Sequence, residues 1–355
     1  MQSQQLRLAA EMQYKHELDA IAAADDAEKP HGWQLSPHAV LLYITGGKCG
    51  DVEVTPKYIG HKRLVEIAIA TLLTDRGLLL TGDPGTAKSW LSEHLCAAIC
   101  GDSTAVIQGT AGTTEEQITY GWNYAMLIAH GPTSDALVKT PLYTAMEHGS
   151  LVRFEEISRC VGEVQDTLIG VMSEQAMPIS ELNMTINSQR GFNIIATANS
   201  RDRGVHAMSA ALKRRFNTVI LLPPASPEIE REIVQTRLAQ LTHGLPLTVK
   251  LPDDNTIDKV VTIFRELRAG ASDKEKIKSP SGAMSTAEAI SMLINAMALS
   301  TGFGDGKIAN NDLAAGLMGA IVKDEDKDLP VFREYLDIVV KRRDKSLYTA
   351  CRELL

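Results

Sequence analysis

The spacing of apolar and polar residues divides the chain into three stretches. Residues 1–28 have a loose helical spacing of apolar positions, and the Lys-Pro-His-Gly run at 29–32 ends it. From Val52 to Leu222, short apolar runs alternate with helical patterns, and from Ser226 onward the patterns are helical. This order predicts a mixed α/β region followed by a helical region. For residues 1–28, a frayed tail and a docking helix for a neighbouring molecule are equal alternatives.

Short apolar runs in the middle stretch are the candidate strands. Because helical patterns separate them, they are typical of a parallel sheet covered by helices. The expected strands are 77–81, 104–108, 150–154, 192–197 and 218–222, and the expected later helices are 226–242, 255–269, 284–300, 310–322 and 330–344. A short helix and a glycine pair are expected within 36–50, and residues 271–281 have the composition of a polar loop.

A glycine-rich segment connects the first of these strands to a helix. Residues 82–89, with the sequence GDPGTAKS, match G-x-x-x-x-G-K-[ST] except that Ala87 replaces the second glycine. A loop at this place directs several backbone N–H groups at one point, and the helix dipole adds to the attraction for anions. An ordinary glycine-rich turn is the alternative, but the strand, the Lys-Ser pair and the helix together favour a phosphate loop.

This loop supplies the predicted nucleotide-binding residues. Lys88 can reach the terminal phosphates of ATP, and Ser89 can hold the Mg²⁺ that bridges them. Gly82 and Gly85 permit backbone angles that a side chain would forbid. The full predicted set is Gly82, Asp83, Pro84, Gly85, Thr86, Ala87, Lys88, Ser89 and Trp90.

Two adjacent acids, Glu155 and Glu156, follow the strand expected at 150–154. Nucleotide hydrolases place an acid here to hold Mg²⁺ through water, and the next residue polarises the attacking water. Glu155 stands where aspartate is usual, so the metal geometry must adjust to one more methylene. Arg153 is also unusual, because such strands are normally apolar throughout. The alternative is an exposed strand end with two solvated acids.

Two further polar sites follow along the chain. Asn199 ends the strand expected at 192–197 and could bond the γ-phosphate or orient the lytic water, although an asparagine that satisfies local backbone groups is common there. Lys213, Arg214 and Arg215 precede the next strand. Arginine matches phosphate bidentately and stabilises charge in the transition state, whereas a solvated surface is the plainer interpretation.

The net charge and the amino-acid composition exclude only a few classes of protein. The formal net charge is −8, so no global attraction to nucleic acid or to an anionic membrane is expected. No apolar run approaches the roughly 18 residues of a membrane span, and the polar start is no signal peptide. The scattered cysteines fit buried thiols of a reduced cytoplasm better than disulfides or a zinc site: Cys49, Cys96, Cys100, Cys160 and Cys351.

Taken together, these motifs resemble those of the AAA+ ATPases, and within them the MoxR family, over roughly residues 56 to 300. The phosphate loop is similar to G-x-P-G-x-A-K-[ST], residues 155–159 to D-E-I-N-R, and residues 196–199 to the sensor-1 motif A-T-x-N. Residues 163–174 are similar to a segment that contributes to a helical insert at the ring pore. Residues 212–216 resemble a segment ending in D-R-F, with Arg215 on the family arginine and Arg214 in place of the acid.

The resemblance implies an AAA+ P-loop αβα core with a parallel five-stranded sheet and a helical lid. It divides the chain into an N-terminal helical extension (1–50), a nucleotide-binding domain (51–225) and the lid (226–355). It also implies ATP and Mg²⁺ as ligands and a cytoplasmic homo-hexameric ring. The ring would act on a protein client, often with a von Willebrand A domain partner. From the composition, no membrane insertion is expected, and nucleic acid is the less favoured partner.

The same resemblance assigns roles to the site residues. Ser89 and Glu155 would serve the metal, Glu156 the attacking water, and Asn199 the γ-phosphate. Arg215, or Arg214 beside it, would complete the site of a neighbouring subunit. The family's lid arginine is absent from residues 279–288, and Arg265 and Arg268 on the preceding helix are weak substitutes.

Two rival functions remain from the sequence. A nucleic-acid-linked AAA+ motor would need a basic pore, and the expected pore insert at 173–190 carries Glu174 and Glu181 against Arg190. A nucleotide-gated scaffold with weak turnover is favoured by Glu155 and by the missing lid arginine. ATP turnover measured with and without duplex DNA would separate the three.

Overall fold

The computed structural model describes residues 7–199, 208–242, 249–272 and 275–355. Contacts divide the chain into two compact units, which are described separately: Met1–Gly82 with Ala87–Leu221, and Asp83–Thr86 with Leu222–Leu355. The division into an extension, a nucleotide-binding domain and a lid stays a prediction. None of the helices in the described ranges combines the length and the apolarity that a membrane crossing requires.

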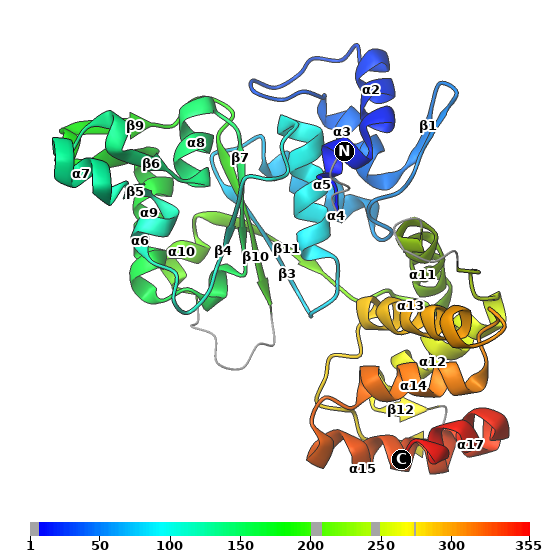
Figure 1. Ribbon diagram of the computed structural model, residues 1–355. Helices are drawn as coiled ribbons and strands as arrows, with labels where there is room; N and C mark the ends of the chain where they lie inside the picture. The colour runs from blue at the N-terminus through cyan, green and yellow to red at the C-terminus, as the bar shows by residue number, and fades with distance from the viewer. Residues whose placement is uncertain (1–6, 200–207, 243–248, 273–274) are drawn as a thin grey trace. The chain divides into compact units, whose positions relative to one another are not determined.

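A five-stranded sheet forms the centre of the first unit, with the order β11-β3-β10-β7-β4 (Figure 1). All neighbouring strands pair in parallel, which confirms the predicted sheet. Its strands are β3 (Gly77–Gly82), β4 (Val106–Gln108), β7 (Leu151–Glu155), β10 (Asn193–Asn199) and β11 (Phe216–Leu221). The strand expected to stop at 197 continues to Asn199, which pairs with Gly82 across the sheet.

Side chains alternate between the two faces of this sheet, as strand geometry requires. Leu78 and Leu80 pack in a core with α3, α4 and α5, whereas Leu79 lies in the core on the opposite face. On β7, Leu151 belongs to the α5 face, and Val152 and Phe154 belong to the other face. Helices on both faces therefore make three layers. The helices of the α5 face are α3 (Pro37–Thr45), α4 (Lys62–Thr71) and α5 (Lys88–Cys100).

Residues 7–28 pack on the first unit, an arrangement that neither of the two alternatives for residues 1–28 described. Helices α1 (Ala10–Gln13) and α2 (Lys15–Ala24) replace the single long helical pattern, and α1 contacts α5. The side chain of Ile21 is 1% exposed, so apolar burial holds this segment in place. The glycine pair begins an antiparallel hairpin that was not predicted, β1 (Gly47–Cys49) with β2 (Val52–Val54).

The opposite face carries the elements between β4 and β11. Two antiparallel hairpins belong to this part of the unit, and neither was predicted: β5 (Tyr120–Trp122) with β6 (Leu137–Lys139), and β8 (Ala176–Ile179) with β9 (Met184–Asn187). The segment expected at 173–190 as a pore insert is therefore the end of a helix followed by a β-hairpin. The helices here are α6 (Glu115–Ile118), α7 (Tyr124–His130), η1 (Ser134–Ala136), α8 (Pro141–His148), η2 (Ile157–Arg159), α9 (Gly162–Glu174), η3 (Ser180–Leu182) and α10 (Ala210–Lys213).

The second unit is built mainly of helices around one apolar core. The last predicted helix, 330–344, begins earlier, because Asp324 accepts a hydrogen bond from the backbone N–H of Lys327 and caps a helix that starts at Glu325. Within the predicted polar loop, β12 (Ala271–Ser272) and β13 (Glu275–Lys276) form a short hairpin. The helices are α11 (Pro227–Thr242), α12 (Asp254–Ala269), α13 (Thr286–Phe303), α14 (Asn310–Ile321), α15 (Glu325–Tyr335), η4 (Leu336–Val340), α16 (Lys341–Arg343) and the unpredicted α17 (Lys345–Glu353).

Candidate functional site

The phosphate loop leaves the carboxyl end of β3 and enters α5 through unusual backbone angles. Gly82 has φ 148° and Gly85 has φ 77°, values that favour glycine. Ala87 has φ 65° and ψ 25° at the residue before α5. Its left-handed conformation explains why the strict motif has glycine here, since alanine in this region costs about 1 kcal/mol. No side chain of the described residues caps α5, so its first backbone N–H groups can face an anion.

Lys88 and Ser89 begin α5 beside this loop. The side chain of Lys88 is buried, and its Nζ donates a hydrogen bond to the carbonyl oxygen of Gly82 at 3.1 Å. Ser89 is exposed, and its Oγ donates to Oε2 of Glu155 at 2.6 Å. A buried cation and an exposed hydroxyl thus lie at the same end of β3 as the loop glycines.

Glu155 ends β7 and receives hydrogen bonds from four side chains. Ser89 and Thr197 donate to Oε2 at 2.6 and 2.7 Å, and Ser92 and Arg153 donate to Oε1 at 2.7 and 2.8 Å. Burial alone would raise the pKa of this carboxyl, but the hydrogen bonds from the three hydroxyls and the charge of Arg153 lower the pKa below its usual range. Glu155 is therefore an ionised, buried carboxylate, and not the solvated strand end that the sequence left as an alternative.

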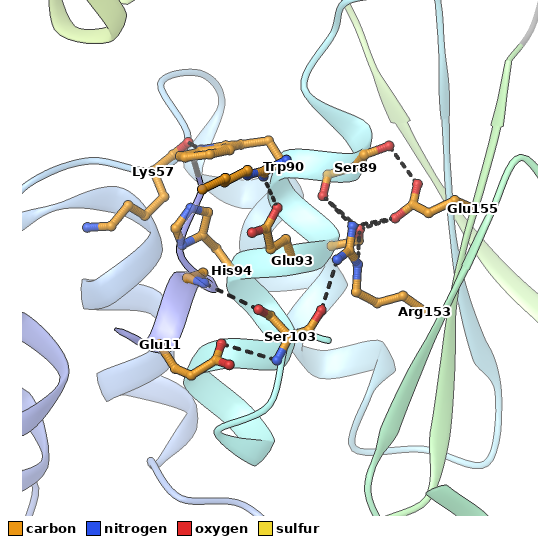
Figure 2. A network of polar contacts seen from close by, with 12 residues as sticks. Glu11, Lys57, Ser89, Trp90, Glu93, His94, Ser103, Arg153 and Glu155 are labelled. Atoms are coloured by element: carbon orange, nitrogen blue, oxygen red, sulfur yellow. Dashed lines mark hydrogen bonds and ion pairs between the residues drawn. The ribbon is translucent and has the colours of Figure 1, made fainter. Parts of the chain in front are cut away.

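The contacts of Arg153 explain why a charged residue can lie within the buried strand β7. Its guanidinium lies between β7 and α5 and bonds Glu155, the Ser92 hydroxyl, and the carbonyl oxygens of Ser89 and Ser103 (Figure 2). The Arg153–Glu155 ion pair is nearly closed to solvent, with side chains 9% and 6% exposed. A buried arginine is tolerated only when it is paired and hydrogen-bonded in this way.

Glu156 follows in a strained conformation. Its φ of 54° lies in the left-handed region, and its backbone N–H donates to Oγ1 of Thr197 at 3.0 Å. Its carboxylate is half-buried and bonds Arg159 at 2.9 Å. Thr197 therefore fixes both acids at once, because its hydroxyl also donates to Glu155. Strain at a non-glycine residue persists only where the surroundings determine the conformation, as here.

Three residues of this arrangement were given no role by the sequence interpretation: Ser92, Arg159 and Thr197. Thr197 has a visible signal, since it is a hydroxyl residue inside the apolar run that precedes Asn199. Ser92 lies one helical turn after Ser89, which places both hydroxyls on the same face of α5. Arg159 follows Glu156 by three residues, and its signal is its place as the last residue of the segment that is similar to D-E-I-N-R.

The remaining predicted residues divide between the two ends of the sheet. Asn199 lies beside Gly82 at the carboxyl end. Arg215 precedes β11 at the amino end, where its carbonyl oxygen accepts from the N–H of Gly77 and its Nε donates to Ser173 at 2.8 Å. Arg214 beside it is exposed. The indole of Trp90 donates a hydrogen bond to the carbonyl oxygen of Lys57, which lies between β2 and α4 (Figure 2).

Two family models match successive parts of the chain. Residues 77–216 match a model for an AAA domain of the dynein-related subfamily, and residues 228–355 match a model for a YehL-like AAA+ ATPase C-terminal domain. The uncharacterised protein YehL of Escherichia coli (strain K12) is 43% identical over 339 residues, which are 93% of this chain and 91% of that protein. An uncharacterised protein of Staphylococcus haemolyticus, SH1500, is 24% identical over 55% of this chain and 69% of its own length.

Among solved structures, NtrX from Brucella abortus in complex with ATP is similar, with a TM-score of 0.51 and 13% identity. The match covers 84% of this chain and 66% of the NtrX chain, so this chain spans slightly less than two thirds of that protein. The fold is that of AAA+ P-loop proteins, a five-stranded parallel sheet with helices and a helical C-terminal region.

Proposed function

The chain belongs to the family of YehL-like AAA+ ATPases, and from that premise we propose that it hydrolyses ATP to ADP and phosphate and uses the cycle to remodel a protein client. The observation that carries the proposal is that four features meet at the carboxyl end of the sheet: the phosphate loop, Glu155, Glu156 and Asn199. Ligands of open α/β sheets bind at this end of the strands.

The residues at this edge suit MgATP. Lys88 would bind the β- and γ-phosphates together with the backbone N–H groups of the loop, and Asn199 would contact the γ-phosphate. The hydroxyl of Ser89 and a carboxylate oxygen of Glu155, 2.6 Å apart, are the hard oxygen donors that Mg²⁺ prefers. When bound, Mg²⁺ would neutralise phosphate charge. Glu156 would take the proton from the attacking water.

The place of Arg215 supports a ring. Arg215 lies next to Gly77 at the amino end of β3, whereas the phosphate loop begins after Gly82 at the other end. Five residues of strand span about 17 Å, which is beyond the reach of an arginine side chain. Arg215 would therefore act on the nucleotide of a neighbouring copy in a homo-hexamer, and Arg214 is the alternative residue for this role.

Mixing two inactive variants tests this arrangement. Arg215→Ala and Glu156→Gln should each lose turnover, the first by about a thousandfold with little loss of ATP affinity. In a mixed ring, some interfaces combine an intact Glu156 with an intact Arg215 from the neighbour, so part of the activity should return. Mixed rings that form but stay inactive would reject Arg215 and make Arg214 the residue to test.

The cellular role is inferred at family level. The resemblance of the motifs to the MoxR type favours chaperone-like activation of a protein client in the cytoplasm, with a von Willebrand A domain protein as partner. The net charge of −8 is compatible with a protein partner and disfavours a nucleic-acid track. Duplex DNA should therefore leave the turnover of ATP unchanged.

ATP binding and turnover by purified protein test the proposal directly. Lys88→Ala should abolish binding of a labelled ATP analogue, and Glu156→Gln should bind MgATP and retain it without hydrolysis. Lys62→Ala, which removes an exposed lysine at the start of α4, is the matched control and should behave as the unaltered protein. Unchanged ATP affinity in Lys88→Ala would refute the assignment of the loop.

A nucleotide-gated scaffold with weak turnover is the second candidate. It is favoured by Glu155, whose oxygens are all engaged, and by Arg265 and Arg268, which both bind Glu230 inside the helical unit. A scaffold would bind ATP in stoichiometric amounts and assemble with it, yet release almost no phosphate. The unaltered protein and Glu156→Gln would then release phosphate at the same low rate.

A further inference from the structure

Two departures from the usual motif lie on the same face of one strand. Arg153 and Glu155 are two residues apart on β7, so both side chains point toward α5, whereas Val152 and Phe154 belong to the core of the opposite face. Each residue alone is unexpected: a glutamate where aspartate is usual, and a cation inside a buried strand. Their direct contact, 2.8 Å between a guanidinium nitrogen of Arg153 and Oε1 of Glu155, joins the two anomalies.

The guanidinium of Arg153 is fixed from several sides. Nε donates to the Oγ of Ser92 at 3.1 Å, one terminal nitrogen donates to the carbonyl oxygen of Ser103 at 3.0 Å, and the other donates to the carbonyl oxygen of Ser89 at 3.1 Å (Figure 2). Ser103 is itself held by the N-terminal segment, since its N–H donates to Glu11 at 3.1 Å. The planar fork can meet all these acceptors in only one orientation.

The two oxygens of Glu155 therefore differ. Oε1 is held by Arg153 and by Ser92, whose side chains are both buried. The Ser92 hydroxyl also lies 2.9 Å from the carbonyl oxygen of Ser89, but an ionised carboxylate is the stronger acceptor for its single proton. Oε2 is bonded by Thr197 in the interior and by the exposed Ser89 at the phosphate loop. Only Oε2 has a partner that can leave toward a ligand.

We propose that Arg153 is a positioning residue for the metal side of this site: it anchors Oε1 of Glu155 and so directs Oε2 to the hydroxyl of Ser89 and to the ligands of Mg²⁺. Arg153 and Glu155 together then take the place of the usual aspartate on an apolar strand. Glutamate is longer by one methylene, and the bond from Arg153 to Oε1 holds the longer side chain in the position that the metal requires. This inference rests on the proposed function, since it concerns Mg²⁺ that accompanies ATP.

A double-mutant cycle tests whether the two residues act as one unit. The variants are Arg153→Met, Glu155→Asp and the double variant, and the measurement is the Mg²⁺ concentration at half-saturation for binding of a fluorescent, slowly hydrolysed ATP analogue. Each single change should raise this concentration by at least about tenfold, as loss of a supporting residue does at metal sites. The double variant should return to within about threefold of the unaltered protein, because it restores the short acid on an apolar strand.

Two controls separate positioning from folding. Arg63→Met removes an exposed arginine with a surface ion pair to Glu66 and should leave the Mg²⁺ requirement unchanged. Arg153→Lys keeps the charge but cannot span Glu155, Ser92 and Ser103 together, so it should raise the Mg²⁺ requirement while binding of the analogue without metal stays the same. If Arg153→Met does not fold, Arg153→Lys and the double variant still decide the question.

The possible failures are distinct. If the unaltered protein binds the analogue without any dependence on Mg²⁺, the proposed function fails at its metal site. If that dependence is present, but Arg153→Lys keeps the normal Mg²⁺ requirement or the effects in the cycle simply add, Arg153 has only a structural role and this inference is overturned.

Discussion

Two buried glutamates, one in each unit, are bound by similar partners and have different surroundings. Glu230 on α11 is fully buried and is bonded by Arg265 and Arg268 of α12 and by the hydroxyl of Thr286 at the start of α13. Glu155 is bonded by one arginine and three hydroxyls, and one of these hydroxyls belongs to an exposed residue at the phosphate loop. Both carboxylates are compensated, but their partners lie in different places: the partly exposed arginines that bind Glu230 belong to the helical unit, whereas Ser89, which binds Glu155, lies at the phosphate loop.

The difference separates a structural ion-pair cluster from a site that a ligand can enter. The partners of Glu230 come from two neighbouring helices, so the cluster fastens α11, α12 and α13 together. It also explains why the two arginines that the sequence offered as substitutes for the missing lid arginine are poor ones, since both guanidinium groups are engaged within the helical unit. A charged residue near a motif is therefore informative only when its partners are known.

Glutamine in place of each glutamate provides the sharpest test of this comparison. Glu155→Gln should lower turnover of ATP by about a hundredfold and raise the Mg²⁺ requirement, because an amide oxygen carries no full charge for the metal and its amide nitrogen cannot accept the hydrogen bonds made to the carboxylate. Steady-state ATPase assays across a Mg²⁺ titration measure both effects. An unchanged Mg²⁺ requirement would remove Glu155 from the metal site.

Glu230→Gln should act on stability instead. It leaves Arg265 and Arg268, whose side chains are 27% and 19% exposed, without their counter-ion, which we expect to cost about 2 kcal/mol of the free energy of unfolding. Urea denaturation followed by circular dichroism measures this loss, and the Mg²⁺ concentration at half-saturation should remain that of the unaltered protein. A raised Mg²⁺ requirement in Glu230→Gln would show that the two clusters are not functionally separate.

Two threonines offer a smaller, matched perturbation. Thr197 donates to Glu155 and Thr286 donates to Glu230, each at 2.7 Å, and valine has nearly the same shape as threonine without the hydroxyl. Each change removes one hydrogen bond to a charged group, which is worth about 2 kcal/mol of stability. We expect only Thr197→Val to lower turnover as well, because Thr197 also holds the backbone of Glu156. Equal activity in both variants would contradict the role given to Thr197.

The sequence predicted the sheet better than it predicted the site. The five strands have short apolar runs next to helical patterns, and local periodicity determines such elements, so the parallel sheet is confirmed. The hairpins β5–β6 and β8–β9 were missed, because their short strands carry too few residues to show an alternating pattern. The roles of Lys88, Glu156 and Asn199 stay predictions, although these residues lie at one edge of the sheet.

The partners of Arg153 could not be predicted, for a different reason. The sequence showed a charged residue in a buried strand, but its acceptors other than Glu155 come from α5 and from the segment after α5, 50 to 64 residues away in the chain. Pairing across such distances depends on how the helix lies over the sheet, which no local pattern encodes. The same applies to Lys57, whose partner Glu17 lies 40 residues earlier on α2.

Lys57 is a buried cation that can be compared with the buried carboxylates of Glu155 and Glu230. Its test is the one with the smallest expected effect. Its ammonium group is fully buried, bonds Glu17 at 2.6 Å and lies 4.2 and 4.5 Å from the ring centroids of Tyr14 and Tyr43. Burial lowers the pKa of Lys57 to about 8, although Glu17 acts to raise it. In the unfolded chain the pKa of this lysine is the ordinary 10.5, so between these two values the unfolded state binds more protons than the folded state.

The free energy of unfolding should therefore rise with pH between these two pKa values, because the buried ammonium group of Lys57 loses its proton and its charge in the folded protein. Relative to Lys57→Met, the unaltered protein should gain about 1 kcal/mol between about pH 7.5 and about pH 9. Urea denaturation of both proteins at the two pH values measures the difference, and the variant cancels contributions from other titrating groups. If the difference stays constant, Lys57 remains charged throughout the window. The ion pair with Glu17 and the two aromatic rings would then compensate the buried ammonium as fully as the arginines compensate Glu155 and Glu230.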